Sequence, residues 1–234
     1  MLTLSKQLIR SLLKKLPLKF LLIAGLFIGV SLLFALITQE VIFEKEAEFD
    51  NKVIHFFSPY SNAAFIQLME VFTFFGSGKF LFPAYVVIVA YLLMRRQTLI
   101  SLHIAIIAVT STALSQGAKR IFQRTRPEMP LIQSLKTYSF PSGHALSSFI
   151  FCSVLVYLVW RANIQTGWKW VFSIFLFLFS MTIGLSRVIL KMHYPTDVLA
   201  GFCLGFIWVI LSFYLLNRIQ AKRGKSKIFR EKAG

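Results

Sequence analysis

The sequence alternates between long apolar runs and short polar segments. A helix needs roughly 20 apolar residues to cross the hydrocarbon core of a bilayer. Six runs approach or reach that length, at residues 20–37, 80–94, 99–118, 145–160, 170–185 and 198–216. The pattern therefore predicts an all-α, polytopic membrane protein with six transmembrane helices.

Residues 51–75 show a different pattern, in which several phenylalanines are mixed with Ser, Asn, Gln and Glu70. Such a mixture favours a helix that lies in the membrane interface over one that crosses the bilayer. Gly76-Ser77-Gly78 then interrupts the helical pattern before the second span. We expect an interfacial helix between the first and second spans.

Composition agrees with the membrane class, since 56% of the residues are hydrophobic and only 15% are charged. The formal net charge of +17 would also suit a protein that binds nucleic acid. However, the charge is gathered at the chain ends, as a topology signal would be. Residues 1–19 carry several cations and no acid, and residues 218–234 carry a single acid. We therefore expect no nucleic-acid partner.

Charge distribution also predicts the topology. A basic segment before an apolar run is a feature of secretory signals, but no small-x-small cleavage site closely follows residues 20–37, which are interpreted as an uncleaved span. With six spans, residues 1–19 and 218–234 lie in the cytoplasm and residues 20–217 form the membrane domain. Residues 40–50 hold five of the nine acids, which fits the outer side.

Two loops depart from this charge pattern. Residues 118–143 and 186–197 lie on the outer face in the predicted topology, and both are rich in Lys and Arg. Cations on the side that topology does not favour imply a local anion. Beside a bilayer, phosphate is the obvious candidate.

The longer of these loops contains two polar clusters. Lys119 and Arg126 stand seven residues apart at the outer end of the third span. Ser142, Gly143 and His144 stand at the entry to the fourth span, where free N–H groups of a helix N-terminus favour an anion. Taken singly, the first cluster could be a snorkelling anchor and the second a helix cap.

A third cluster follows the fifth span. Arg187, His193 and Asp197 stand in quick succession between apolar runs, where ionisable groups need partners and usually mark function. A carboxylate four residues after a histidine can hold one ring nitrogen and leave the other free to attack or to protonate. Alone, His193 and Asp197 could equally be a structural pair.

Together the three clusters resemble the signature of the type-2 phosphatidic acid phosphatase superfamily, which reads K-x6-RP, then PSGH, then SR-x5-H-x3-D. The positions are filled in order by Lys119, Arg126, Pro127, Pro141, Ser142, Gly143, His144, Ser186, Arg187, His193 and Asp197. The six-span layout is similar to that of the small bacterial members. A three-part signature with correct order and spacing is far more specific than any one of its parts.

The resemblance implies a lipid phosphatase that works through a phosphohistidine. His193 would attack phosphorus, Asp197 would fix its tautomer, and His144 would protonate the leaving group. The expected phosphate-binding groups are Lys119, Arg126, Ser142, Gly143 and Arg187. We expect neither a metal nor another cofactor, because Glu128 and Asp197 are the only carboxylates in or next to the motif loops.

The expected partners are the bilayer and a membrane lipid phosphate that reaches a site on the extracytoplasmic side of the cell membrane. Similarity to bacterial phosphatidylglycerophosphatases favours phosphatidylglycerol phosphate. Undecaprenyl diphosphate is the main alternative, and phosphatidic acid and diacylglycerol pyrophosphate stay open. A lipid phosphotransferase, a transporter or flippase and a catalytically inactive lipid-binding scaffold are the other classes considered. The scaffold is disfavoured because His144, His193 and Asp197 are all present.

Overall fold

The computed structural model describes the backbone of residues 17–60, 62–132 and 137–232, and within them the side chains except those of Lys19, Tyr60 and residues 222–232. All regular secondary structure in these ranges is helical, and they contain no strand. The helices are α2 (Leu18–Thr38), η1 (Gln39–Phe43), α3 (Glu48–Phe57), η2 (Ser58–Tyr60), α4 (Ala63–Phe75), α5 (Gly78–Met94), α6 (Thr98–Phe122), α7 (Gly143–Arg161), α8 (Thr166–Ile189) and α9 (Pro195–Lys232). Most of the two predicted basic ends, residues 1–19 and 218–234, lies outside the described side chains.

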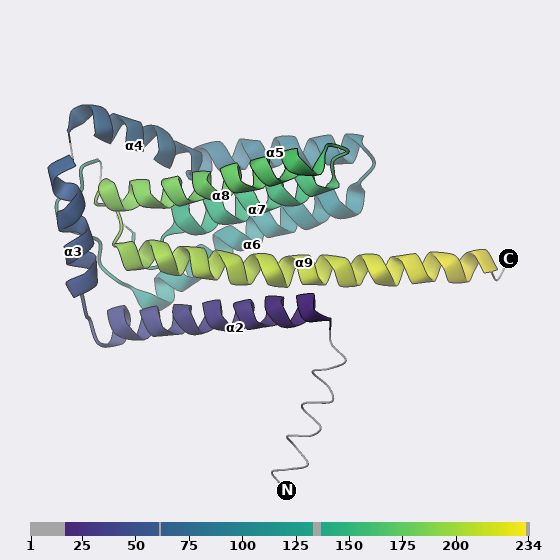
Figure 1. Ribbon diagram of the computed structural model, residues 1–234, viewed down its shortest axis with the longest axis horizontal. Helices are drawn as coiled ribbons and strands as arrows, with labels where there is room; N and C mark the ends of the chain where they lie inside the picture. Colours follow the sequence, from purple (N-terminus) through teal and green to yellow (C-terminus); the bar gives the residue numbers. More distant parts are fainter. Residues whose placement is uncertain (1–16, 61, 133–136, 233–234) are drawn as a thin grey trace, which may run out of the picture.

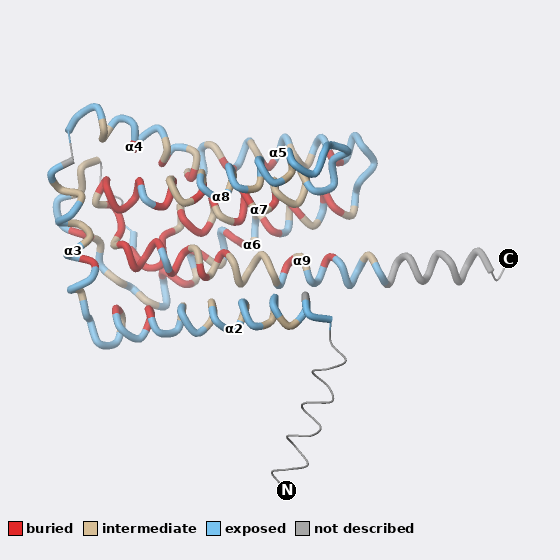
Figure 2. The backbone as a smooth tube through the Cα atoms, viewed as in Figure 1, coloured by how far each residue is buried: buried red, intermediate tan, exposed pale blue. Residues whose placement is uncertain are grey.

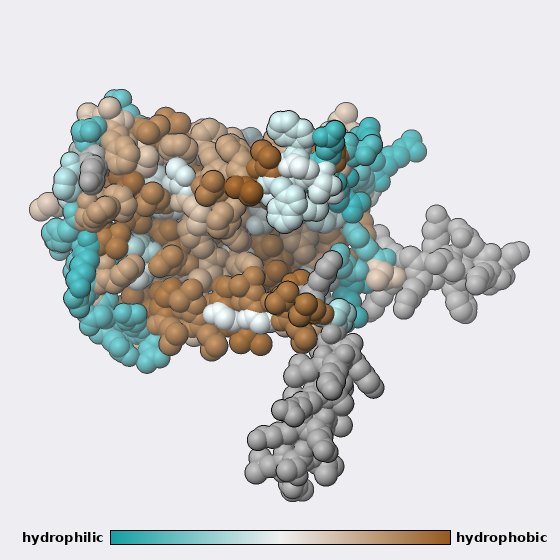
Figure 3. Space-filling model, in the orientation of Figure 1, coloured by the Kyte–Doolittle hydropathy of each residue, from teal (hydrophilic) through white to brown (hydrophobic). Residues whose placement is uncertain are grey.

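Six segments have the length and apolar composition of membrane spans, which confirms the predicted class. Figure 1 shows them as a bundle in which α7 contacts α6, α8 and α9, and α2 packs along α9. Figure 3 shows an apolar belt between two hydrophilic ends. Buried backbone is concentrated in α7, α8 and α9 toward the end that α3 crosses (Figure 2). That end is the one that holds the motif residues.

The second span is longer than predicted. Only α3 runs across the end of the bundle as an interfacial helix would (Figure 1). The rest of the segment predicted to be interfacial belongs to α4, which packs against α8 and continues through Gly76 into α5. The apolar segment Ala63–Met94 therefore forms one interrupted span. Met69 and Thr73 are buried against α8, which explains why α4 stays in the bundle.

Candidate active site

The three predicted clusters meet at one end of the bundle. They lie at the C-terminal end of α6, at the N-terminal end of α7, and between α8 and α9. The backbone N–H of Ser142 donates to the carbonyl oxygen of Asp197 at 2.9 Å, and Arg126 Nη1 lies 3.3 Å from His193 Nε2. Segments separated by more than fifty residues in sequence thus form one polar site.

His193 is completely enclosed, and its surroundings define its tautomer. A guanidinium can only donate hydrogen bonds, so Nε2 accepts from Arg126 and the ring proton resides on Nδ1. Nδ1 faces Asp197 Oδ2 at 3.4 Å. Burial lowers the pKa of His193 to about 3, although Asp197 acts in the opposite direction. The ring is therefore neutral and carries its lone pair on Nε2.

The carboxylate of Asp197 is held by donors on both oxygens. Arg124 Nη1 donates to Oδ1 at 2.8 Å. The backbone N–H of Tyr194 donates to Oδ2 at 2.9 Å, and the hydroxyl of Ser139 donates to the same oxygen. These bonds fix the plane of the carboxylate relative to the His193 ring.

Arg187 is a buried cation with unused donors. It lies in the last turn of α8 and is 2% exposed. Its Nη1 donates to Thr73 Oγ1 at 2.7 Å, whereas Nε and Nη2 have no partner among the described residues. Buried charges are normally paired, because transfer out of water is otherwise very costly. A guanidinium with two free donors suits a phosphate, whose oxygens accept such bonds in pairs.

The other two predicted cations, Lys119 and Arg126, lie in the site and donate to carbonyl oxygens of the loops around it. Lys119 Nζ donates to the carbonyl oxygens of Tyr138 and Ser139 at 2.7 and 3.0 Å. Arg126 donates to the carbonyl oxygens of Thr137 and Met192 at 2.8 and 2.6 Å. Burial lowers the pKa of Arg126 from its ordinary value. Both cations therefore shape the loop around His193.

The N-terminus of α7 is held close to its neighbours. Ser142 is the N-cap, and its side chain accepts from the N–H of Ala145 at 3.5 Å. A Cβ added to Gly143 would lie 3.0 Å from Ser115 Oγ. A Cβ added to Gly201 of α9 would lie 2.7 Å from the carbonyl oxygen of Ser142. Glycine at these positions lets α6, α7 and α9 approach one another where the motifs meet.

The sequence comparison now gives the family. The sequence profile of the PAP2 superfamily matches residues 97–221, more than half of the chain. Phosphatidylglycerophosphatase B of Bacillus subtilis (strain 168) is 31% identical over 167 residues, covering 71% of this chain and 79% of that protein. The chain belongs to the PAP2 superfamily. The predicted family and the predicted class, a membrane lipid phosphatase, are confirmed.

One solved structure and one more distant relative extend the comparison. The crystal structure of the first transmembrane PAP2-type phosphatidylglycerolphosphate phosphatase from Bacillus subtilis matches with a TM-score of 0.76 at 24% identity, covering 82% of this chain and 96% of that one. This likeness shows a shared fold. The undecaprenyl-diphosphatase of Sulfolobus acidocaldarius is 28% identical over 120 residues, covering 49% of this chain and 54% of that protein.

The PAP2 signature did not identify several residues that touch the site. They are Asp50, Thr73, Gly76, Arg124 and Ser139. Asp50 had a readable signal, because Asp50, Val53 and Phe57 recur at helical spacing on one face of α3. Val53 and Phe57 pack against the core, so this face is the buried one.

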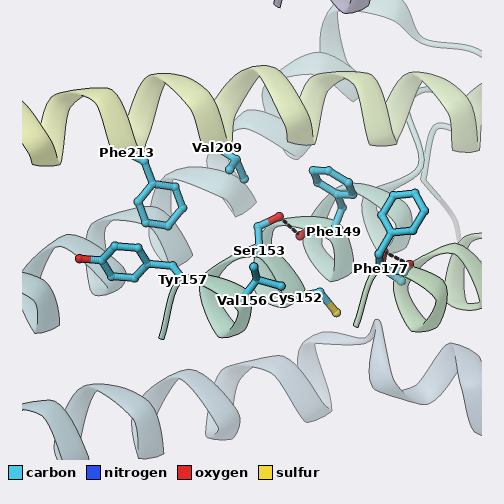
Figure 4. A pocket seen from close by; sticks show the side chains of 9 residues that line it. Phe149, Cys152, Ser153, Val156, Tyr157, Phe177, Val209 and Phe213 are labelled. Atoms are coloured by element: carbon cyan, nitrogen blue, oxygen red, sulfur yellow. Dashed lines mark hydrogen bonds between the residues drawn. The ribbon is translucent and has the colours of Figure 1, made fainter. Parts of the chain in front are cut away.

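A cavity of about 320 Å³ between α7, α8 and α9 is separate from the PAP2 site (Figure 4). Its lining is mostly apolar and includes Phe149, Tyr157 and Phe213. None of the signature residues lines it. The cavity lies among membrane-spanning segments and does not contribute to the polar site.

Gly76, at the break between α4 and α5, contacts the PAP2 site through His144. A Cβ at Gly76 would lie 2.6 Å from Ile183 Cγ2 and 3.1 Å from His144 Cδ2. Ile183 is a β-branched side chain buried on α8, so it has little room to move. The absence of a side chain at position 76 therefore determines where the His144 ring lies.

We expect Gly76→Ala to lower kcat by roughly 10- to 100-fold, because a displacement of about 1 Å at a catalytic group can cost that much. The measurement is phosphate release under saturating lipid substrate. Gly78→Ala is the matched control, since no atom lies within 4 Å of a Cβ at this position two residues away. Equal activity of the two variants would show that the Gly76 contact does not position His144.

Proposed function

We propose that the chain hydrolyses phosphatidylglycerol phosphate to phosphatidylglycerol and inorganic phosphate through a phosphohistidine. His193 Nε2 attacks phosphorus, a P–N bond forms, and the P–O bond to the lipid alcohol breaks. His144 donates a proton to the departing oxygen. Water then gives a proton to His144 and attacks phosphorus; a P–O bond forms, the P–N bond breaks, and inorganic phosphate and His193 are released. Asp197 stabilises the imidazolium form that arises between the two steps.

The observation that carries this proposal is that Arg187, a buried cation, and His193, a neutral imidazole, lie at the same end of the bundle. A nucleophile needs a lone pair, and the tautomer derived from Arg126 and Asp197 places it on Nε2, where it becomes available once Arg126 turns its donor to a phosphate oxygen. Phosphoryl transfer needs fixed positive charge at the non-bridging oxygens, and Arg187 supplies two buried donors without a partner in the described part of the chain. Both requirements are met at the same end of the bundle.

The other proposed phosphate ligands surround this pair. Ser142 and the N–H of Gly143 stand at the N-terminus of α7, where the helix favours negative charge. Lys119 has three N–H donors and gives two to the closing loop. Arg126 reaches Nε2 of His193 itself, so it would contact an oxygen of a phosphate bound there. The roles of these residues follow from position and charge.

The identity of the lipid rests on the relatives. A relative that is 31% identical and covers 71% of this chain is named a phosphatidylglycerophosphatase, which favours phosphatidylglycerol phosphate. The relative named an undecaprenyl-diphosphatase covers about half of this chain, so undecaprenyl diphosphate is the second candidate. Both lipids end in a phosphate that could reach the polar end of the bundle while the tails remain in the bilayer.

The decisive experiment offers both lipids to the purified protein in detergent with EDTA and measures phosphate release. Release that survives EDTA supports hydrolysis without a dissociable metal ion, and the ratio of kcat/KM between the lipids identifies the substrate. Consumption of lipid phosphate without free phosphate would replace hydrolysis by transfer to an alcohol. No reaction with either lipid would refute the proposed substrates.

We also propose that the site faces the extracytoplasmic side. Both described chain ends lie at the end of the bundle away from α3 (Figure 1). Arg95 and Arg161 end their helices at that same end, as the excess of cations on the cytoplasmic side requires. Impermeant maleimide should label Glu128→Cys but not Ala162→Cys in intact cells. The reverse pattern would place the site in the cytoplasm.

A further inference from the structure

Two buried carboxylates share one arginine beside the active site. Arg124 Nη1 donates to Asp197 Oδ1 at 2.8 Å, and Nη2 donates to Asp50 Oδ2 at 2.7 Å. Asp50 is 1% exposed and Asp197 is fully enclosed. Although burial opposes it, the two carboxylates raise the pKa of Arg124 above its ordinary value. Arg124 is therefore a permanently charged bridge between α3 and α9.

Further contacts make the bridge rigid. The N–H of Thr196 donates to Asp50 Oδ1 at 2.9 Å. The hydroxyl of Thr196 accepts from Arg124 at 2.9 Å and donates to Asp50 Oδ2 at 2.7 Å. The guanidinium also lies over the ring of Tyr194, 4.2 Å from its centroid. Every polar atom of Asp50 and both Nη atoms of Arg124 thus have partners.

Arg124 contacts the Asp197 oxygen that faces away from His193. Oδ2 faces His193 Nδ1, whereas Oδ1 is the oxygen that accepts from Arg124. The N–H of Tyr194 and the hydroxyl of Ser139 hold Oδ2, but a carboxylate bound at this oxygen alone can still swing about it and change its plane relative to the ring. The bond from Arg124 to Oδ1 fixes the second oxygen and so the plane, and Asp50 keeps Arg124 in place.

We propose that Asp50 and Arg124 are positioning residues that fix the Asp197 carboxylate and, through it, the orientation of the His193 ring. The proposal rests on the function proposed above, in which His193 is the nucleophile. It assigns a catalytic purpose to α3, since this helix brings Asp50 to the site from outside the three motifs. Neither residue contacts the position of the phosphate; both act through Asp197.

The kinetic test compares Arg124→Gln, Arg124→Lys and Asp50→Asn. We expect Arg124→Gln to lower kcat by about 10- to 100-fold, the size found when partners that orient a catalytic ligand are removed. KM should change by less than about threefold, because substrate contacts are intact. Arg124→Lys, which keeps the charge, and Asp50→Asn should show smaller losses. Asp50→Asn combined with Arg124→Gln should be no worse than Arg124→Gln, because the residues act as a unit.

A second readout does not need turnover. Nitrogen and proton NMR of the ¹⁵N-labelled histidine ring report which nitrogen carries the proton, with His193→Ala used for assignment. We expect the Nδ1–H tautomer in both the wild type and Arg124→Gln, because Arg126 still donates to Nε2, but the Nδ1–H proton signal should move upfield in Arg124→Gln as the hydrogen bond to Asp197 weakens. This measurement separates the two proposals: a wild type that releases no phosphate would refute the function, while the shift of the Nδ1–H signal would still support the positioning role.

Two exposed charged residues near Arg124 and Asp50 provide the control variants. Arg120→Gln removes an exposed cation from the same end of α6, and Glu48→Gln removes an exposed acid from the same turn of α3. Both should stay within about twofold of wild-type activity. Unchanged kcat in Arg124→Gln, or an Nδ1–H signal at its wild-type position in that variant, would overturn the proposal. Where Arg124→Gln fails to fold, Arg124→Lys is judged by the same criteria.

Discussion

Replacement of His193 by alanine is expected to abolish phosphate release, with a loss in kcat of about 10⁴-fold or more, as removal of a covalent nucleophile does. Alanine deletes the whole imidazole, including the Nε2 that lies beside Arg126 and the Nδ1 that faces Asp197. The remaining cations can still bind an anion, so substrate affinity should change much less than turnover. Phosphate release at saturating lipid concentration measures the effect.

The covalent intermediate provides a direct check on that result. Quenching the reaction with ³²P-labelled lipid should trap a phosphoprotein that is labile to acid and stable to base, and His193→Ala should lack it. His55→Ala is the matched control, because His55 is an exposed histidine on α3. Phosphate release above about one hundredth of the wild-type rate in His193→Ala would remove this residue as the nucleophile.

The sequence predicted that Arg187, His193 and Asp197 lie together because they are close along the chain. His193 and Asp197 are four residues apart, and Arg187 lies in the last turn of α8, just before the turn that holds His193. The backbone N–H groups of Met192 and His193 both donate to the carbonyl oxygen of Arg187, which turns the chain back over the site. Local geometry of this kind is readable from spacing alone.

The residues that were missed make contacts that spacing cannot show. Thr73 and Arg187 are separated by 114 residues, and Asp50 and Thr196 by 146. Asp50 was interpreted with its acidic neighbours as a topology signal, although it is the buried one among them. The polar character of residues 51–75 also obscured α4, in which Thr73 is buried and Glu70 is exposed. Such features depend on which helices pack together.

Arg187→Met should inactivate the protein and stabilise it. Loss of two buried donors at the phosphate should lower kcat/KM by about 10³-fold, as removal of an arginine from a phosphoryl-transfer site does. At the same time the change removes a 2% exposed cation that has one hydrogen bond and no carboxylate partner among the described residues. Apolar replacement of buried charge can stabilise by roughly 1 to 4 kcal/mol, so we expect Tm to rise by roughly 3 to 10 °C.

Thermal unfolding with and without vanadate, a phosphate-shaped anion, separates these two effects. A ligand at about 100 times its Kd stabilises the folded state by about 2.7 kcal/mol, so vanadate should raise the Tm of the wild type and leave that of Arg187→Met unchanged. Thr73→Val provides the graded control: it removes the single acceptor of Arg187 but keeps the cation, so the vanadate shift should shrink without disappearing. A full vanadate shift in Arg187→Met would show that Arg187 does not hold the anion. A lower Tm in that variant would mean that this buried charge stabilises the fold, although Nε and Nη2 have no partner among the described residues.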